Sequence, residues 1–222
     1  MPDTDALKDR ACDAIEEHRE EIISLAKSIE DEPELGFKET ETTRKVVETF
    51  EGMGLDAEDP LAVTGARARI GSGDPTIAVL GELDALVNPE HPKANPETGA
   101  CHACGHHAQI ANMTGTAFAF ATTDVLDELG GQVDAIAVPA EEYLDLGFRR
   151  SLKDDGKIEF FGGKQELIRR GYLDDVDAAM MVHAADDTPE REVTTRNSTN
   201  GFVGKFVTYE GKASHAGGAP DE

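Results

Sequence analysis

Hydrophobic residues recur every three or four positions along the first part of the chain. Between Ala6 and Ile29 they are separated at this helical spacing by Glu, Asp and Lys, a pattern typical of one amphipathic helix. This helix would cover one face of a sheet. The same spacing returns over residues 40–53, where Gly54 follows as a stop signal, so we expect a second helix there.

Short apolar runs predict strands over residues 62–70, 76–80, 133–138 and 178–182. Helical spacing reappears over 108–120 and, briefly, over 166–170. The segment 87–99 contains three prolines and predicts a loop. Because strands alternate with helices, we expect an α/β fold with a mostly parallel sheet flanked by helices. Ligands in such folds collect at the carboxyl ends of the strands.

The pattern of polar and apolar residues changes near the end of the chain. Residues 194–201 are polar, and residues 202–207 alternate as in a strand. We therefore predict one domain over residues 1–195 and the start of a second, α+β domain over 196–222. The sequence ends too soon after this strand to build the whole second domain.

Composition and charge narrow the class of protein. No apolar run approaches the roughly 20 residues that span a bilayer, and the N-terminus lacks the pattern of a secretory signal. We therefore expect a soluble, cytoplasmic protein. The formal net charge of −24 would repel nucleic acids and anionic membranes. Such an acidic excess is also tolerated at high internal salt, so we hypothesise a halophilic source; an ordinary acidic cytosolic protein is the alternative.

Cysteine and histidine are concentrated in the segment CHACGHH, residues 101–107. Three cysteines in a chain without an export signal do not indicate a disulfide framework. Cys101 and Cys104 have the spacing of a dithiol redox centre. A closed structural zinc site or a catalytic metal site with an open position are the two metal alternatives. The residues could also simply cap and pack the helix that follows.

Carboxylates and a histidine follow two of the predicted strands. Glu141 and Glu142 come directly after the strand over 133–138, and His183 follows the strand over 178–182. Neighbouring residues that leave a strand point in different directions, so one carboxylate could bind metal while the other acts on water. A Glu-Glu pair is usually a solvated turn, and a lone histidine is usually a bystander. Their positions at strand ends favour the metal site.

Four motifs in order give the chain a resemblance to a known family. They are GELDAL (81–86), HACGH (102–106), PAEE (139–142) and GKASHA (211–216), and the turn PELGF (33–37) fits as well. The chain resembles the aminoacylase and carboxypeptidase-like metal-dependent amidohydrolases. Within that family it is similar to the cysteine-ligand branch, which includes indole-acetyl-amino-acid, hippurate and aminobenzoyl-glutamate hydrolases.

The resemblance implies a site for two divalent metal ions, which could be zinc, manganese, nickel or cobalt. The implied metal ligands are Cys104, His106, Glu142 and His183. Glu141 would be the general base that takes a proton from water and passes it to the leaving amine. Asp84 would orient a ligand imidazole; its alternative role is a strand-end cap.

His215 lies in what the resemblance implies is a dimerisation lid. There it would reach across a homodimer to stabilise the oxyanion of the tetrahedral intermediate. The implied activity is hydrolysis of an amide bond in a small N-acyl amino acid or peptide-like substrate. We expect the chain to be C-terminally truncated relative to this family, so a non-catalytic remnant that binds metal or dimerises is the alternative. The roles of Cys101 and His107 stay open.

Overall fold

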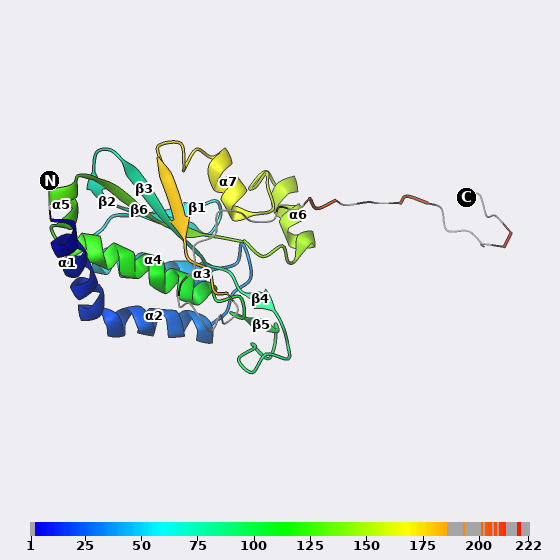
Figure 1. Cartoon of the computed structure of the whole chain (residues 1–222). Coiled ribbons are helices and arrows are strands. Elements are labelled where there is room, and N and C mark those ends of the chain that lie inside the picture. Colours follow the sequence, from blue (N-terminus) through cyan, green and yellow to red (C-terminus); the bar gives the residue numbers. More distant parts are fainter. Residues whose placement is uncertain are drawn as a thin grey trace. The chain divides into compact units, whose positions relative to one another are not determined.

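The computed structural model describes residues 3–185, 193, 201, 203–205, 207, 209–211 and 217–218. The chain divides into two compact units, Met1–Ala185 and Asp186–Glu222, and every helix and strand described here lies in the first (Figure 1). The predicted boundary at residue 195 stays a prediction. The strand expected over 202–207 falls partly outside the described residues.

A five-stranded sheet forms the centre of the first unit, in the order β1-β2-β6-β3-β7. Its strands are β1 (Ala57–Leu61), β2 (Gly65–Ser72), β3 (Thr76–Glu82), β6 (Gly131–Val138) and β7 (Ala178–Met181). The pairings β1/β2 and β2/β6 are antiparallel, whereas β6/β3 and β3/β7 are parallel. The predicted α/β class is confirmed, and the sheet is mixed.

Seven helices occur in the described part of the chain. They are α1 (Thr4–Glu17), α2 (Arg19–Asp31), α3 (Thr40–Gly52), α4 (His106–Ala121), α5 (Val125–Leu129), α6 (Leu146–Asp154) and α7 (Gly163–Arg169). Two short strands, β4 (Leu86–Val87) and β5 (Ala100–Cys101), pair antiparallel at the two ends of the predicted loop.

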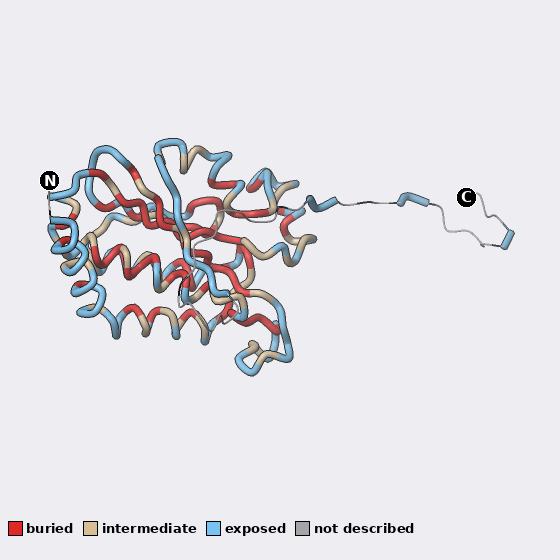
Figure 2. The backbone as a smooth tube through the Cα atoms, in the orientation of Figure 1, coloured by how far each residue is buried: buried red, intermediate tan, exposed pale blue. Residues whose placement is uncertain are grey.

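Helix α4 is the central element of one face of the sheet. It packs on β3 and is covered by α1 and α2 on its other side (Figure 1). Ile110 and Met113 of α4 are fully buried against Val79 of β3, and the middle of the molecule is correspondingly buried in Figure 2. On the opposite face, Ala78 and Leu167 belong to a second core cluster, because successive side chains of a strand point to opposite faces.

The prediction of a single helix over residues 6–29 was wrong. The structure has two helices, α1 and α2, which meet at His18. The backbone there leaves helical geometry, with φ −95° and ψ 10°, and the His18 ring stacks on Phe118 of α4 at 4.2 Å between ring centroids. Both helices pack on α4, so the apolar spacing continues across the break and hides it in the sequence.

The other predicted elements appear close to their expected positions, as α3, β2, β3, α4, β6, α7 and β7. The sequence patterns missed β1, β4, β5, α5 and α6, which are short or contain few apolar residues. Within the described residues, no helix is long and apolar enough to cross a membrane.

Glu166 fixes α7 to the segment that precedes it. Its buried carboxylate accepts the backbone N–H groups of Glu159 and Phe160, both at 2.9 Å, and pairs with Arg169 and Arg170. Burial by itself raises the pKa of Glu166, but these partners outweigh it and lower the pKa from 4.5 to about 2. The carboxylate is therefore a source of folded-state stability that depends on its charge.

We expect Glu166→Gln to lower the free energy of unfolding at pH 7 by about 2 kcal/mol. Because the pKa of Glu166 is lower in the folded state, its contribution is present above pH 4.5 and is lost as the pH falls toward 2. Urea unfolding at a series of pH values should therefore show that the free energy of unfolding falls less steeply with acid in the variant than in the unsubstituted chain. Glu159→Gln, at an exposed side chain, is the control; an equal effect there would contradict the prediction.

Candidate metal centre

Four segments with ligand-type side chains meet at one edge of the sheet. The parallel strands β6, β3 and β7 are neighbours, so their carboxyl ends lie side by side. Glu82 ends β3, residues 139–142 follow β6, and His183 follows β7. Residues 104–106 precede α4, which packs on β3. Gly105 has φ 89°, a conformation that glycine adopts without strain.

His106 is fully buried at the centre of this edge. Its Nδ1 lies 2.7 Å from the backbone carbonyl of Asp84, which can only accept, so Nδ1 carries a hydrogen. Its Nε2 lies 2.9 Å from Glu82 Oε2 and 4.0 Å from Glu141 Oε2. Burial lowers the pKa of His106, but Asp84 and Glu82 outweigh it and raise the pKa to about 11. A metal ion at Nε2 would therefore have to displace a proton.

Cys104 and His183 face each other beside this imidazole. Cys104 Sγ lies 3.4 Å from His183 Nε2, while His183 Nδ1 lies 2.6 Å from the carbonyl of Ala184. Cys104, His106 and His183 offer ligand atoms that all lie within 4.8 Å of one another. Burial raises the pKa of the Cys104 thiol, and the nearby Glu142 carboxylate raises it further.

Glu82 is a site residue that the sequence reasoning missed. With His106 and Glu141 it forms a second group whose ligand atoms lie within 4.8 Å of one another. Lys164 of α7 pairs with Glu82 Oε1, and Gln109 donates to Glu82 Oε2 at 2.9 Å. Burial raises the pKa of Glu82, but His106 and Lys164 outweigh it and lower the pKa to about 2, so Glu82 is a carboxylate. The signal in the sequence that could have identified Glu82 was a charged residue at the end of a buried strand.

Asp84 connects the imidazole with the carboxylate loop. One carboxylate oxygen lies 3.4 Å from His106 Nδ1, and the other accepts the backbone N–H of Glu142 at 2.9 Å. Asp84 is completely buried. Asp84 therefore holds two of the predicted metal ligands. It holds His106 through its backbone carbonyl and its carboxylate, and it holds Glu142 through its carboxylate.

The structure brings together most of the residues singled out from the sequence: Asp84, Cys104, His106, Glu141, Glu142 and His183. His215 lies outside the described residues. Cys101 is buried on β5, where its thiol lies 3.9 Å from the carbonyl of Asn88. The rings of His102 and His107 lie 5.5 Å apart.

The chemistry of these side chains fits divalent cations. A thiolate, imidazoles and carboxylates are the ligands that zinc and related metals take in proteins. Three carboxylates, those of Glu82, Asp84 and Glu141, surround the single imidazole of His106. Lys164 compensates the charge of Glu82, and a bound cation would compensate the negative charge that remains.

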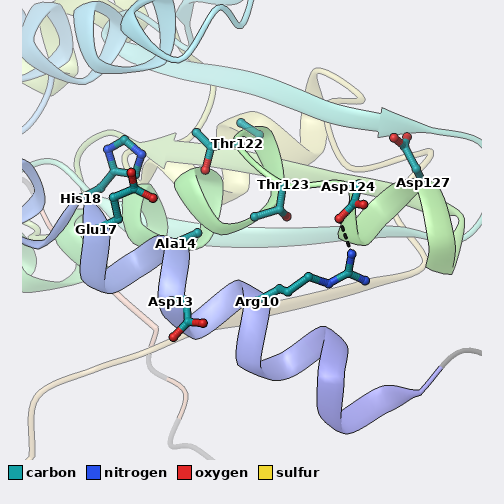
Figure 3. A pocket seen from close by; sticks show the side chains of 10 residues that line it. Arg10, Asp13, Ala14, Glu17, His18, Thr122, Thr123, Asp124 and Asp127 are labelled. Carbon is teal, nitrogen blue, oxygen red and sulfur yellow. Dashed lines mark hydrogen bonds and ion pairs between the residues drawn. The ribbon is translucent and has the colours of Figure 1, made fainter.

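A surface hollow of about 720 Å³ lies elsewhere, between α1 and the turn that joins α4 to α5 (Figure 3). Arg10 reaches from α1 to Asp124 across it. None of the metal-ligand candidates lines this hollow.

Sequence comparison identifies relatives among named hydrolases. No protein-family model matches the chain. An IAA-amino acid hydrolase ILR1-like 6 of Arabidopsis thaliana is 34% identical over 179 residues, which cover 78% of this chain and 34% of that protein. The N-acetylcysteine deacetylase of Bacillus subtilis is 30% identical over 88% of this chain and 49% of its own length. The chain thus spans between a third and a half of the length of these relatives.

Two solved structures share the fold at 28% sequence identity. An aminohydrolase from methicillin resistant Staphylococcus aureus matches 77% of this chain and 41% of its own with a TM-score of 0.61. The Bacillus subtilis YXEP protein, described as a dinuclear metal binding peptidase from the M20 family, matches 74% of this chain and 42% of its own with a TM-score of 0.55.

Over most of its length the chain is therefore similar to metal-dependent amidohydrolases. The resemblance recognised in the four motifs is thereby confirmed.

Proposed function

We propose that this chain carries a two-metal centre of an amidohydrolase that cleaves the amide bond of an N-acyl amino acid or peptide-like substrate. The observation that carries the proposal is the pair of overlapping ligand groups around His106. One group adds Cys104 and His183, and the other adds Glu82 and Glu141. Similarity to a dinuclear metal binding peptidase supports two ions rather than one.

Cys104, His106, Glu142 and His183 would hold the metal, which could be zinc, manganese, nickel or cobalt. When bound, such ions polarise a substrate carbonyl and make water more acidic. Asp84 fixes the ring of His106, since its carbonyl and carboxylate both lie at Nδ1.

Glu141 would act as the general base. It is half-buried and lies beside His106 without binding it closely. Burial raises the pKa of Glu141, and the charge of Glu82 raises it further. A carboxylate with a raised pKa is better matched to taking a proton from water and delivering it to the leaving amine.

The substrate class follows from the relatives, whose names specify IAA-amino acids and N-acetylcysteine. We propose an N-acyl amino acid for this chain as well. The oxyanion role of His215, the homodimer, the cytoplasmic location and the domain division at residue 195 stay predictions.

Metal content is the first test of the proposed function. The unsubstituted chain should bind about two divalent ions, whereas Cys104→Ala and Glu142→Ala should each lose metal because a ligand is removed. Elemental analysis after dialysis against zinc or manganese measures this directly. Cys12→Ala, at an exposed thiol, is the control, and normal metal content in Cys104→Ala would contradict the ligand assignment.

The second prediction concerns turnover. Glu141→Gln keeps the shape of the side chain but removes the base, so the rate of hydrolysis should fall by about 10²–10⁴-fold while metal content is unchanged. Release of amino acid from a panel of N-acyl amino acids provides the measurement, with Glu159→Gln as an exposed control. Wild-type turnover in Glu141→Gln would exclude its role as the base.

The acidic surface supports a further proposal, adaptation to concentrated salt. The 45 acidic side chains outnumber the 21 basic ones, and the resulting net charge of −24 makes the chain repel itself in dilute buffer. Raising KCl from about 0.1 to 1 M shortens the screening length from about 10 to 3 Å, so the midpoint of thermal unfolding should rise by about 10 °C. Sucrose at equal osmolality is the uncharged control. A midpoint independent of KCl would contradict halophilic adaptation.

A further inference from the structure

The loop that carries Glu141 and Glu142 has an unusual backbone. Ala140 lies in the left-handed region, with φ 52°, a conformation that a non-glycine residue keeps only when its surroundings enforce it. The loop's N–H groups are bound by buried carboxylates that are distant in sequence. Glu39 accepts the N–H of Ala140 at 2.7 Å, and Asp84 accepts that of Glu142 at 2.9 Å.

Arg149 of α6 binds the carbonyl groups of the same loop. Its Nη1 donates to the carbonyl of Ala140 at 3.4 Å and also to that of Phe161, and its Nη2 donates to the carbonyl of Glu142. One guanidinium thus holds the residues on both sides of Glu141. A planar, rigid fork of donors fixes the spacing of two acceptors in a way that an ammonium group cannot.

The buried position of the Arg149 guanidinium lowers the stability of the fold. Its side chain is completely buried, and no ion pair within the described residues includes it. The carboxylate of Asp84 attracts it from a distance. Its direct partners are carbonyl groups rather than a carboxylate, and a buried charge without an ion pair costs several kcal/mol. The arginine therefore indicates a requirement other than stability.

The turn over residues 33–37 is built around this guanidinium. A Cβ atom on Gly36 would come within 2.9 Å of Ala140 Cα and would collide with Arg149 Nη2. The ring of Phe37 lies 5.4 Å from the Arg149 guanidinium carbon. The turn that the sequence singled out therefore forms part of the wall around the arginine, and glycine at position 36 leaves the space it occupies.

We propose that Arg149 is a positioning residue for this metal centre. Its guanidinium clamps the carbonyls of Ala140 and Glu142, while Glu39 and Asp84 hold the N–H groups between which Glu141 lies. The clamp directs Glu141 toward His106 and Glu142 toward Cys104. This inference rests on the proposed function for its role, but every contact of the clamp is made between residues of this chain.

The clamp is tested first by hydrogen exchange of the metal-free protein. Arg149→Met should speed exchange of the amides over 140–142 at least tenfold, and Arg149→Lys should also speed it because an ammonium cannot span both carbonyls. Arg150→Met is the matched control, since Arg150 is the exposed neighbour on α6 and pairs with Asp154; it should change exchange less than twofold. Wild-type exchange in Arg149→Met would overturn the clamp. If Arg149→Met does not fold, Arg149→Lys decides.

The positioning role is tested by titration with Co²⁺, followed through the absorption of the cobalt-thiolate bond at Cys104. Arg149→Met should weaken Co²⁺ binding at least tenfold, and in a Glu142→Gln background the same substitution should change it less than twofold. A purely structural role would weaken binding equally in both backgrounds and would overturn the proposal. Absence of the thiolate band in the unsubstituted chain would reject the metal centre, whereas the exchange of amides 140–142 still decides the clamp.

Discussion

The site depends on the buried imidazole of His106, which is held between Asp84 on one side and the carboxylates of Glu82 and Glu141 on the other. A buried imidazole with acceptors at both nitrogens has a fixed ring orientation, and its Nδ1 carries a hydrogen. This orientation requires that β3, the loop after β6 and the start of α4 meet at one edge. The parallel pairing of β6, β3 and β7 provides that meeting.

Concentrating carboxylates in a protein interior needs compensating positive charge. In the described part of the chain, Lys164 of α7 and Arg149 of α6 supply it, the first by direct pairing with Glu82 and the second by binding the loop carbonyls near Asp84. The helices α6 and α7, which follow the loop over 139–142, therefore place positive charge at the sheet edge where this loop begins. Buried charge of this kind is typical of sites where function rather than stability sets the residue.

Most of the fold could be predicted from local patterns. The helices α3 and α4 have helical spacing of apolar residues, and the strands β3 and β6 are short apolar runs, because each buries one side or both sides in a core. The break at His18 could not be predicted, since both helices keep their apolar sides toward α4 and the break is stabilised by the ring of Phe118, 100 residues away in sequence.

The sequence by itself determined the kinds of candidate ligand and their order, because Cys104, His106, the Glu141-Glu142 pair and His183 lie in short motifs at the ends of recognisable strands and helices. Only the tertiary structure decided the partners of these residues. Glu82 and Lys164 are 82 positions apart, and Glu39 and Ala140 are 101 apart. In a sequence, a charged side chain that will be buried is indistinguishable from one that stays in solvent, because its burial is set by elements that are distant along the chain.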